Sequence, residues 1–300
     1  MTAIRIRLAD VLGFAAPLVL LAVGAAVATP TRTWVVSLSV WTGCIALGVV
    51  SIGLRARFPG RFTEILAAFW PIPVVFAIYA TLNPVIDRVS PALMDPFLMR
   101  ADHALLGGYL AVWADGHIPP FLVDLLMVCY ASYYLWPVLL AALLFRENRH
   151  EALARLTTLV LMAVWLNMLF YVLVPVIGPR FSLATHFTGP PQGWLVGTAL
   201  YEAFLRSPMI RDCFPSGHTA LSLLILWFAF RHHRRLFWVM LPVVVGLLSA
   251  TFLLRFHYLL DLVFAVPFLL GVHALWVFVS ARVPDAWEWA PAEGVHPAHI

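Results

Sequence analysis

Two histidine motifs in the C-terminal half of the chain contain residue types suited to phosphoryl transfer. The string Cys213-Phe214-Pro215-Ser216-Gly217-His218 is followed, 39 residues after its histidine, by His257-Tyr258-Leu259-Leu260-Asp261. Two apolar stretches lie between the histidines, separated by the basic turn 231–235. Because each stretch is about long enough to cross a bilayer, we expect both histidines at the same membrane face. Paired histidines beside a Ser-Gly turn favour phosphoryl chemistry at that face.

The residues of the two motifs suit particular steps of such a reaction. Ser216, Gly217 and His218 open a predicted helix, where free backbone amides and the helix dipole favour an anion. His257 and Asp261 are four residues apart, and we expect them to share one helical face. The carboxylate would then hold the proton on one ring nitrogen, which leaves the other nitrogen free to attack phosphorus.

A phosphate site also needs a cation, and Arg180 is the first candidate. It follows Gly178 and Pro179, directly after a predicted span, and is expected on the same side as the histidines. Its planar guanidinium matches the geometry of phosphate oxygens. The three cysteines, Cys44, Cys129 and Cys213, show no paired spacing and no metal-site pattern, so we interpret them as packing residues.

Composition places these motifs in a membrane protein. The chain is 62% hydrophobic and 11% charged, with a mean hydropathy of +0.91, which is outside the range of soluble domains. We therefore predict an all-α fold: a polytopic bundle of about eight transmembrane helices with the catalytic core in the C-terminal half. The charge-free runs that are long enough to span are Val11–Thr31, Thr33–Leu54, Ile65–Ile86, Leu125–Phe145, Leu156–Pro179, Cys213–Phe230, Leu236–Leu254 and Leu262–Ala281.

The remaining segments divide the chain into three regions. Residues 1–118 are predicted to hold N-terminal transmembrane helices and an interfacial segment, 119–282 the catalytic transmembrane core, and 283–300 a disordered tail. Pro91–Leu110 and Leu195–Leu205 have apolar residues at helical spacing and are expected to form helices along the membrane interface. We expect the first apolar run to be retained, since it is too long for a signal peptide.

The distribution of arginines predicts the membrane orientation. With eight spans, the side that holds both termini carries 12 of the 19 arginines and the opposite side carries 7. By the positive-inside rule, both termini are cytoplasmic and the histidine motifs face outward, in a plasma (bacterial inner) membrane. No basic cluster is interleaved with exposed aromatics, so we expect no nucleic-acid partner.

With these motifs assembled, the chain resembles the type 2 phosphatidic acid phosphatase superfamily, whose site is shared with vanadium haloperoxidases. Gly178-Pro179-Arg180, Pro215-Ser216-Gly217-His218 and His257-Leu260-Asp261 are similar to its three signature motifs, within roughly Leu156–Ala281. The resemblance implies a mechanism without metal or cofactor. His257 would be the nucleophile that forms a phosphohistidine, Asp261 its orienting partner, and His218 the acid for the leaving group, with Ser216, Gly217 and Arg180 holding the phosphate.

Two positions depart from the family pattern. Leu173 stands where the first motif usually has Lys, and Thr251 stands where the third usually has Arg. Both changes resemble the branch of inositol phosphorylceramide synthases (inositolphosphotransferases), as does the string Asp212–Ser216. Arg255 and Arg211 are candidates to replace the lost cationic contacts with phosphate.

Three functional classes follow from the resemblance. The first is a lipid-phosphate or polyprenyl-diphosphate phosphatase, in which water resolves the phosphohistidine. The second is a phospholipid head-group phosphotransferase, in which a lipid or polyol hydroxyl does so. The third is a non-enzymatic membrane protein on the same scaffold, against which intact His218, His257 and Asp261 count. We favour the phosphatase, with a lipid phosphate or diphosphate as substrate.

Overall fold

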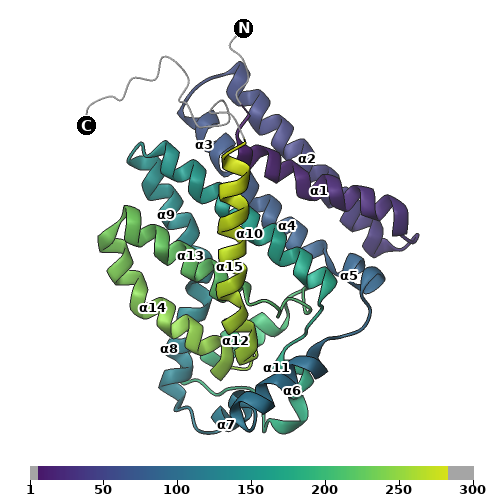
Figure 1. Cartoon of the computed structure of the whole chain (residues 1–300), viewed down its shortest axis with the longest axis vertical. Coiled ribbons are helices and arrows are strands. Elements are labelled where there is room, and N and C mark those ends of the chain that lie inside the picture. Colours follow the sequence, from purple (N-terminus) through teal and green to yellow (C-terminus); the bar gives the residue numbers. More distant parts are fainter. Residues whose placement is uncertain (1–5, 283–300) are drawn as a thin grey trace.

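Long apolar helices account for most of the computed structural model, which describes residues 6–282 (Figure 1). Within these residues, seven helical segments are long and apolar enough to cross a membrane, which indicates a multi-pass membrane protein and confirms the predicted all-α fold class. They are α1 (Leu8–Val27), α2 (Arg32–Arg57), α3 with α4 (Arg61–Phe69 and Pro71–Thr81), α8 with η1 and α9 (Pro120–Ala131, Ser132–Tyr134 and Leu135–Arg146), α10 (His150–Leu173), α14 (Arg234–Leu253) and α15 (Leu259–Ser280).

The eighth predicted span is a shorter helix, α13 (Gly217–His232). Its 16 residues cover about 24 Å at 1.5 Å per residue, less than the other seven segments. Ser216 caps its start, and the basic turn ends it at His233. α14 then begins at Arg234, so α13 and α14 form the expected hairpin that returns the chain to the level of the Ser-Gly-His turn.

Several short helices gather at the end of the bundle opposite the last turns of α15 (Figure 1). Helices are found in both segments where the sequence predicts them outside the spans: α6 (Asp95–Leu106) and the start of α7 (Leu110–Ala114) in the first, and α12 (Gly197–Leu205) in the second. The other short elements are α5 (Asn83–Val89), α11 (Pro179–Ser182) and η2 (Ala184–His186). The predicted tail, 283–300, lies outside the described residues.

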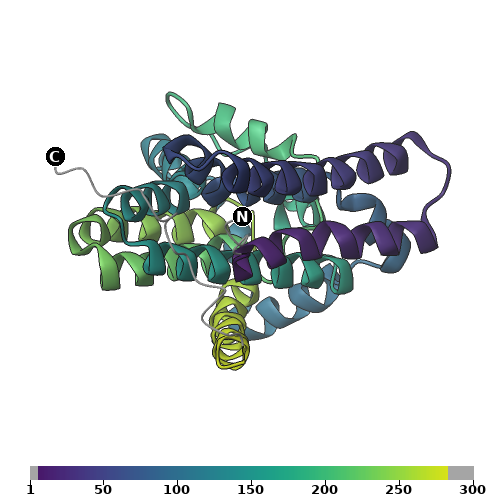
Figure 2. The same cartoon turned by 90° about the horizontal axis from the view of Figure 1, so that it is seen from above.

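Helix α10 lies between two hydrophobic cores. One core joins α10 to α9, α13, α14 and α15, and includes Leu159, Phe228 and Phe268. The other joins α10 to α2, α4 and α5, and includes Trp41 and Trp70. Figure 2 shows α1 and α2 extending away from the helices of the C-terminal half. α10 thus connects the N-terminal helices to the half that carries the histidine motifs.

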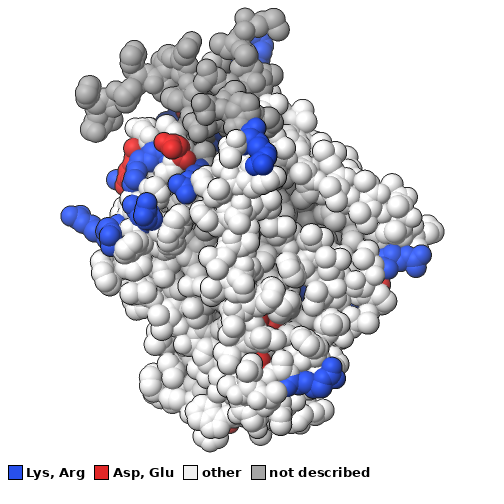
Figure 3. Space-filling model, viewed as in Figure 1, with Lys and Arg blue, Asp and Glu red and all other residues white. Residues whose placement is uncertain are grey.

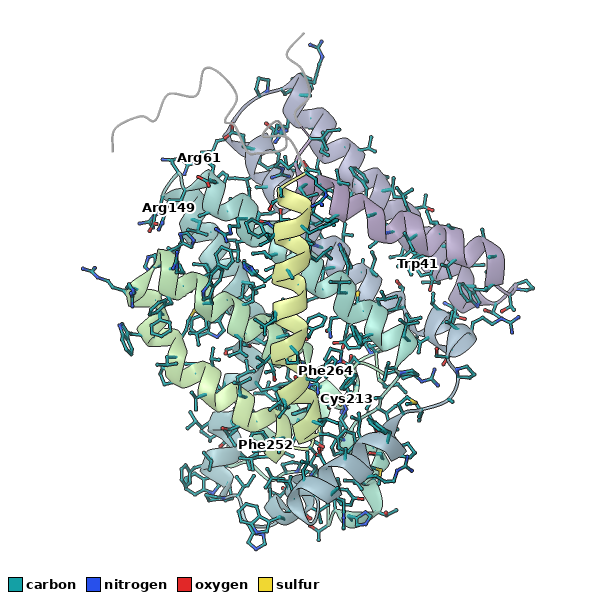
Figure 4. All side chains as sticks on the ribbon, viewed as in Figure 1. Trp41, Arg61, Arg149, Cys213, Phe252 and Phe264 are labelled. Carbon is teal, nitrogen blue, oxygen red and sulfur yellow. The ribbon has the colours of Figure 1, made fainter. Side chains whose placement is uncertain are left out.

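Charged side chains and the histidine motifs lie toward different ends of the molecule. On the face shown in Figure 3, the largest group of charged side chains lies at the end of the molecule where α15 finishes. Arg61 and Arg149 lie there in Figure 4, whereas Cys213 lies in the other half of the bundle, beyond the start of α15. The motifs are therefore positioned away from the arginine-rich end.

Candidate active site

His257 and Asp261 are neighbours at the start of α15. His257 Nδ1 is 3.4 Å from Asp261 Oδ2, and both side chains are buried. Because α15 begins at Leu259, His257 precedes the helix, and the pair does not share a helical face as the sequence predicted. Instead, Asp261 reaches back and also accepts a hydrogen bond from the Tyr258 amide at 2.9 Å. Since Nδ1 faces the carboxylate, Nε2 is the nitrogen available for attack.

The thiol of Cys213 contacts both members of this pair. Its Sγ is 2.8 Å from Asp261 Oδ2 and 3.3 Å from His257 Nδ1. The Cys213 amide donates to the Val176 carbonyl at 3.1 Å, which fixes the residue beside the pair. Sequence reasoning assigned Cys213 to packing and missed these contacts. The available signal was its position, directly before the Phe-Pro-Ser-Gly-His string.

Within the described residues, these three side chains form the one cluster with the composition of a metal site. The ligand atoms of Cys213, His257 and Asp261 lie within 4.8 Å of one another. They contact one another directly, and a metal there would take the carboxylate that orients the imidazole. The absence of a metal from the mechanism stays a prediction.

His218 faces the same site from the start of α13. Its ring centroid lies 5.7 Å from that of His257. The ring packs against Tyr130 and Tyr133, at centroid distances of 4.5 and 4.4 Å. Its Nε2 atom is buried and has no hydrogen-bond partner within the described residues. An unsatisfied imidazole nitrogen in such a place is available to a ligand atom.

Ser216 links the two motifs. Its hydroxyl oxygen accepts a hydrogen bond from the Thr219 amide at 3.2 Å and so caps α13. Its own amide donates to the Asp261 carbonyl at 3.3 Å. The side chain is fully buried. The start of α13 is therefore tied directly to the start of α15, and the two histidines are held in a fixed relation.

Gly217 lies close to a polar pair from α10. A Cβ atom at this position would lie 2.5 Å from Asn167 Oδ1 and 2.9 Å from the Tyr171 hydroxyl, so only glycine fits. Asn167 Nδ2 donates to the Pro215 carbonyl at 2.9 Å, and Tyr171 donates to Asn167 Oδ1 at 2.5 Å. α10 thereby supports the Ser-Gly-His turn through contacts that the sequence analysis did not anticipate.

Arg180 lies beside the histidines in an ion pair. Its Nη2 is 3.1 Å from Asp212 Oδ1, while the Tyr79 hydroxyl of α4 donates to Asp212 Oδ2. Burial by itself lowers the pKa of Arg180, but the Asp212 carboxylate outweighs it and leaves the pKa raised. Gly178 makes the preceding turn with φ of +82°, where a Cβ would lie 2.7 Å from the Phe256 carbonyl oxygen.

The other two arginines that the sequence proposed are directed to carboxylates elsewhere. Arg255 pairs with Asp115 and donates to the Gly189 carbonyl at 2.6 Å. Arg211 pairs with Asp87. The structure therefore brings together Arg180, the Ser-Gly-His turn and the His-Asp pair. The guanidinium groups of Arg255 and Arg211 are engaged instead with Asp115, at the end of α7, and Asp87, in α5.

Two buried carboxylates of α6 hold the second motif from outside. Asp95 Oδ1 accepts hydrogen bonds from the Tyr258 hydroxyl at 3.0 Å and from the Gly178 amide at 2.9 Å. Asp102 accepts from the amides of Leu259 and of the next residue, at 2.8 and 3.0 Å, and so caps α15. Burial raises the pKa of Asp102. The two amide hydrogen bonds lower this pKa, but by less than burial raises it, so the pKa stays above its ordinary value. Neither carboxylate was identified from the sequence.

The two positions that depart from the family pattern have no cationic substitute at the same place. Leu173, at the end of α10, is 57% exposed, so its side chain does not point into the buried site. Thr251 is fully buried, and its hydroxyl donates to the Leu248 carbonyl at 2.6 Å. The Thr251 carbonyl accepts from the His257 amide at 2.8 Å, which makes this residue a support for the histidine.

Comparison with known proteins gives one match. The family model of the PAP2 superfamily matches residues 96–275, which is 180 of the 300 residues. No curated protein and no solved structure matches the chain. The matched region includes all three motifs and Asp102 of α6. Asp95, the other α6 carboxylate that contacts the motifs, precedes the region by one residue.

Proposed function

The chain belongs to the PAP2 superfamily, and from this we propose that it is an integral membrane lipid-phosphate or polyprenyl-diphosphate phosphatase that acts through a phosphohistidine. The family and the helical membrane fold support phosphatase-like activity. The observation that carries the finer proposal is the placement of the His218 ring 5.7 Å from the His257 ring, with Asp261 behind His257.

In the first step, His257 Nε2 attacks phosphorus and the bond to the leaving oxygen breaks. Asp261 holds the proton on Nδ1 and stabilises the positive charge that develops on the ring. His218 Nε2, which has no protein partner within residues 6–282, gives a proton to the departing lipid oxygen. The products are a phosphohistidine at His257 and a lipid alcohol, or a polyprenyl monophosphate when the substrate is a diphosphate.

In the second step, water attacks the phosphohistidine on the same phosphorus. His218, now neutral, takes a proton from that water, and the phosphorus–nitrogen bond breaks. Inorganic phosphate leaves, and both histidines return to their starting protonation states. The same group thus serves as acid and then as base, as microscopic reversibility requires.

The charge on the transferred phosphoryl group is balanced by Arg180 and the start of α13. The Arg180 guanidinium is planar and can donate to two oxygens at once. The backbone amides after Ser216 point along the dipole of α13. Asp212 holds Arg180 in position but also competes with the phosphate for it, so binding requires the guanidinium to be shared between them.

Phosphotransfer to an alcohol is the second candidate, and the residues at positions 173 and 251 favour it. Leu173 and Thr251 both resemble the inositol phosphorylceramide synthase branch. The same histidines would act, with a polyol or lipid hydroxyl in place of water in the second step. For either reaction, we propose that both termini are cytoplasmic and that the site faces the outer side of the plasma membrane.

The test is to incubate the purified protein in EDTA with a lipid phosphate, with and without inositol, and to follow free phosphate and new phospholipid. Release of phosphate in both conditions supports the phosphatase. New phospholipid formed only with inositol would replace it with the transferase. No turnover of lipid monophosphates or polyprenyl diphosphates, with correctly folded protein, would favour the third class, a non-enzymatic membrane protein.

A further inference from the structure

A cavity of about 220 Å³ begins at the candidate active site and continues into the bundle. His218, Gly217 and Asp212 line one end, and Asn167 and Tyr79 lie beside them. The cavity therefore shares its polar end with the proposed phosphate site. Its walls come from α3, α4, η1, α9, α10 and α13.

Away from this polar end the lining is apolar. Along α10 it runs from Tyr171 to Leu156, sixteen residues whose ends are about 22 Å apart along the helix. Ala68, Ala141 and Leu156 line the far end. Thr157, the hydroxyl residue of α10 that lines the cavity at that depth, already donates to the Leu153 carbonyl at 2.9 Å. Such a lining can make van der Waals contact with hydrocarbon, and its Thr157 hydroxyl does not need a hydrogen bond from a ligand.

The cavity also reaches the outer surface of the bundle, between α4 and the segment formed by η1 and α9. Phe76 and Tyr134 both line it and are 47% and 40% exposed, and their ring centroids lie 5.6 Å apart. Val138, on the next turn of α9, also lines it and is 41% exposed. A molecule dissolved in the bilayer therefore has a sideways approach to the cavity, without passing through water.

We propose that this cavity binds a hydrocarbon chain of the substrate, with the attached phosphate at His218 and Arg180. The inference rests on the proposed function for the position of the phosphate. It assigns a binding role to α3 and α4, whose lining residues 68–79 lie outside the region that matches the family. The part of α10 that lines the cavity is about 22 Å long, more than half of a hydrocarbon core of about 30 Å. A long chain can therefore contact the whole lining, whereas a short chain contacts only the part near the phosphate.

The cavity selects the chain by shape. A hydrocarbon chain in the bilayer is already out of water, so transfer into an apolar cavity brings little hydrophobic gain. A wall that becomes too bulky, in contrast, excludes the part of the chain beyond it. Discrimination by chain length is therefore the property that separates a binding cavity from an incidental gap between helices.

The first experiment narrows the cavity at mid-depth. Val160 lies on the lining of α10, four residues from Leu156. Val160→Trp should lower the ratio of kcat/KM for octadecyl phosphate to that for octyl phosphate by about tenfold or more, the size of effect expected from a steric clash. The matched control is Val245→Trp on α14, where the side chain is 57% exposed and outside the cavity. The control should keep the wild-type ratio.

The second experiment does not depend on turnover. An alkyl phosphate with a photoreactive diazirine at the end of an octadecyl chain should label 68–76 and 156–164, and Val160→Trp should reduce the labelling near Leu156. Labelling confined to the lipid-facing side of α14 and α15, or an unchanged chain-length ratio in an active Val160→Trp protein, would overturn the inference. If the wild type turned over no alkyl phosphate, the proposed function would fail, and the labelling pattern would still decide the site of the chain.

Discussion

The Cys213 thiol lies closer to Asp261 Oδ2 than the imidazole of His257 does, at 2.8 Å against 3.4 Å. All three side chains are buried. One carboxylate oxygen therefore faces a thiol, an imidazole and the Tyr258 amide, and its direction is set by all of them. A residue that sequence reasoning assigned to packing thus belongs to the support of the proposed nucleophile.

Cys213 is expected to act as a positioning residue. Cys213→Ala removes the donor to Asp261 and should lower kcat about fivefold, the worth of roughly one hydrogen bond, with little change in KM. Cys213→Ser restores a donor and should recover most of the loss. The readout is steady-state kinetics on one lipid phosphate. Equal losses for alanine and serine would show that the volume of the sulfur matters and its hydrogen bond does not.

His257→Ala should abolish turnover while the protein stays folded, since it removes the nucleophile of the proposed mechanism. Asp261→Asn should retain a little activity, because the nucleophile remains but its tautomer and orientation are spoiled. A loss on the order of 10⁴-fold accompanies the comparable change in a serine-protease triad. Single-turnover assays with radiolabelled phosphate would detect a covalent phosphoenzyme in the wild type. Near-normal turnover by His257→Ala would contradict the phosphohistidine mechanism.

His218 should matter most for substrates with poor leaving groups. A lipid monophosphate releases an alkoxide that needs a proton, whereas an activated aryl phosphate releases a stable phenolate. His218→Ala is therefore expected to lose much more kcat on the lipid than on the aryl substrate. The check is a comparison of kcat for the two substrates in the wild type and the variant. A loss of the same size on both would indicate a role in binding phosphate.

Arg180 and Arg255 should fail in different ways. Arg180→Ala should lower kcat/KM on the order of 100-fold, because it removes charged hydrogen bonds to the phosphate. Arg255→Ala leaves the Asp115 carboxylate, which is 12% exposed, without its ion-pair partner and should lower the free energy of unfolding by about 3 kcal/mol. Thermal melting in detergent and kinetics on the folded fraction separate the two effects.

The control for Arg255 is the double variant Arg255→Ala with Asp115→Ala, in which no charge is left unpaired. This variant should melt at a higher temperature than Arg255→Ala alone. A normal melting temperature for Arg255→Ala, together with a large rise in KM, would instead support the predicted role of Arg255 in binding phosphate.

The membrane orientation is tested by cysteine labelling. Thr188 is exposed in the long connection before the Pro-Ser-Gly-His string, and His232 is the last residue of α13, within the basic turn 231–235. Thr188→Cys should react with a membrane-impermeant maleimide in intact cells, and His232→Cys should react only after the cells are opened. The three native cysteines are buried, which keeps the background low. The reverse pattern would place the site on the cytoplasmic side.

The fold class followed from the sequence because each apolar run has the length that a bilayer demands. The start of α13 was predicted from the Ser-Gly-His string, and Ser216 is its cap. The charge-free run is longer than this helix because residues 213–215 are apolar but precede the cap. The break between α8 and α9 was invisible, because the run 125–145 carries no charge. The division at residues 118 and 119 stays a prediction.

The site was predictable where its chemistry is concentrated in short motifs. His218, His257 and Asp261 come together because local spacing and one hairpin suffice to place them. Asn167 and Asp102 were missed because their partners are far along the chain, and a lone polar residue in an apolar helix has no signature of its own. The catalytic roles of His218, His257 and Asp261 remain predictions, since only mutants can test them.

The two buried faces of α10 have a consequence for how such proteins diversify. One face packs against α9, α13, α14 and α15. The other face packs against the N-terminal helices through Val164 and Tyr171, and it also carries Asn167, which supports the Ser-Gly-His turn. The part of the chain that is recognisable by sequence is therefore smaller than the part that must fold together. We therefore expect that the N-terminal helices cannot be replaced by those of another protein without disturbing α10. A change in their packing would therefore act through α10 on the Ser-Gly-His turn of the proposed active site.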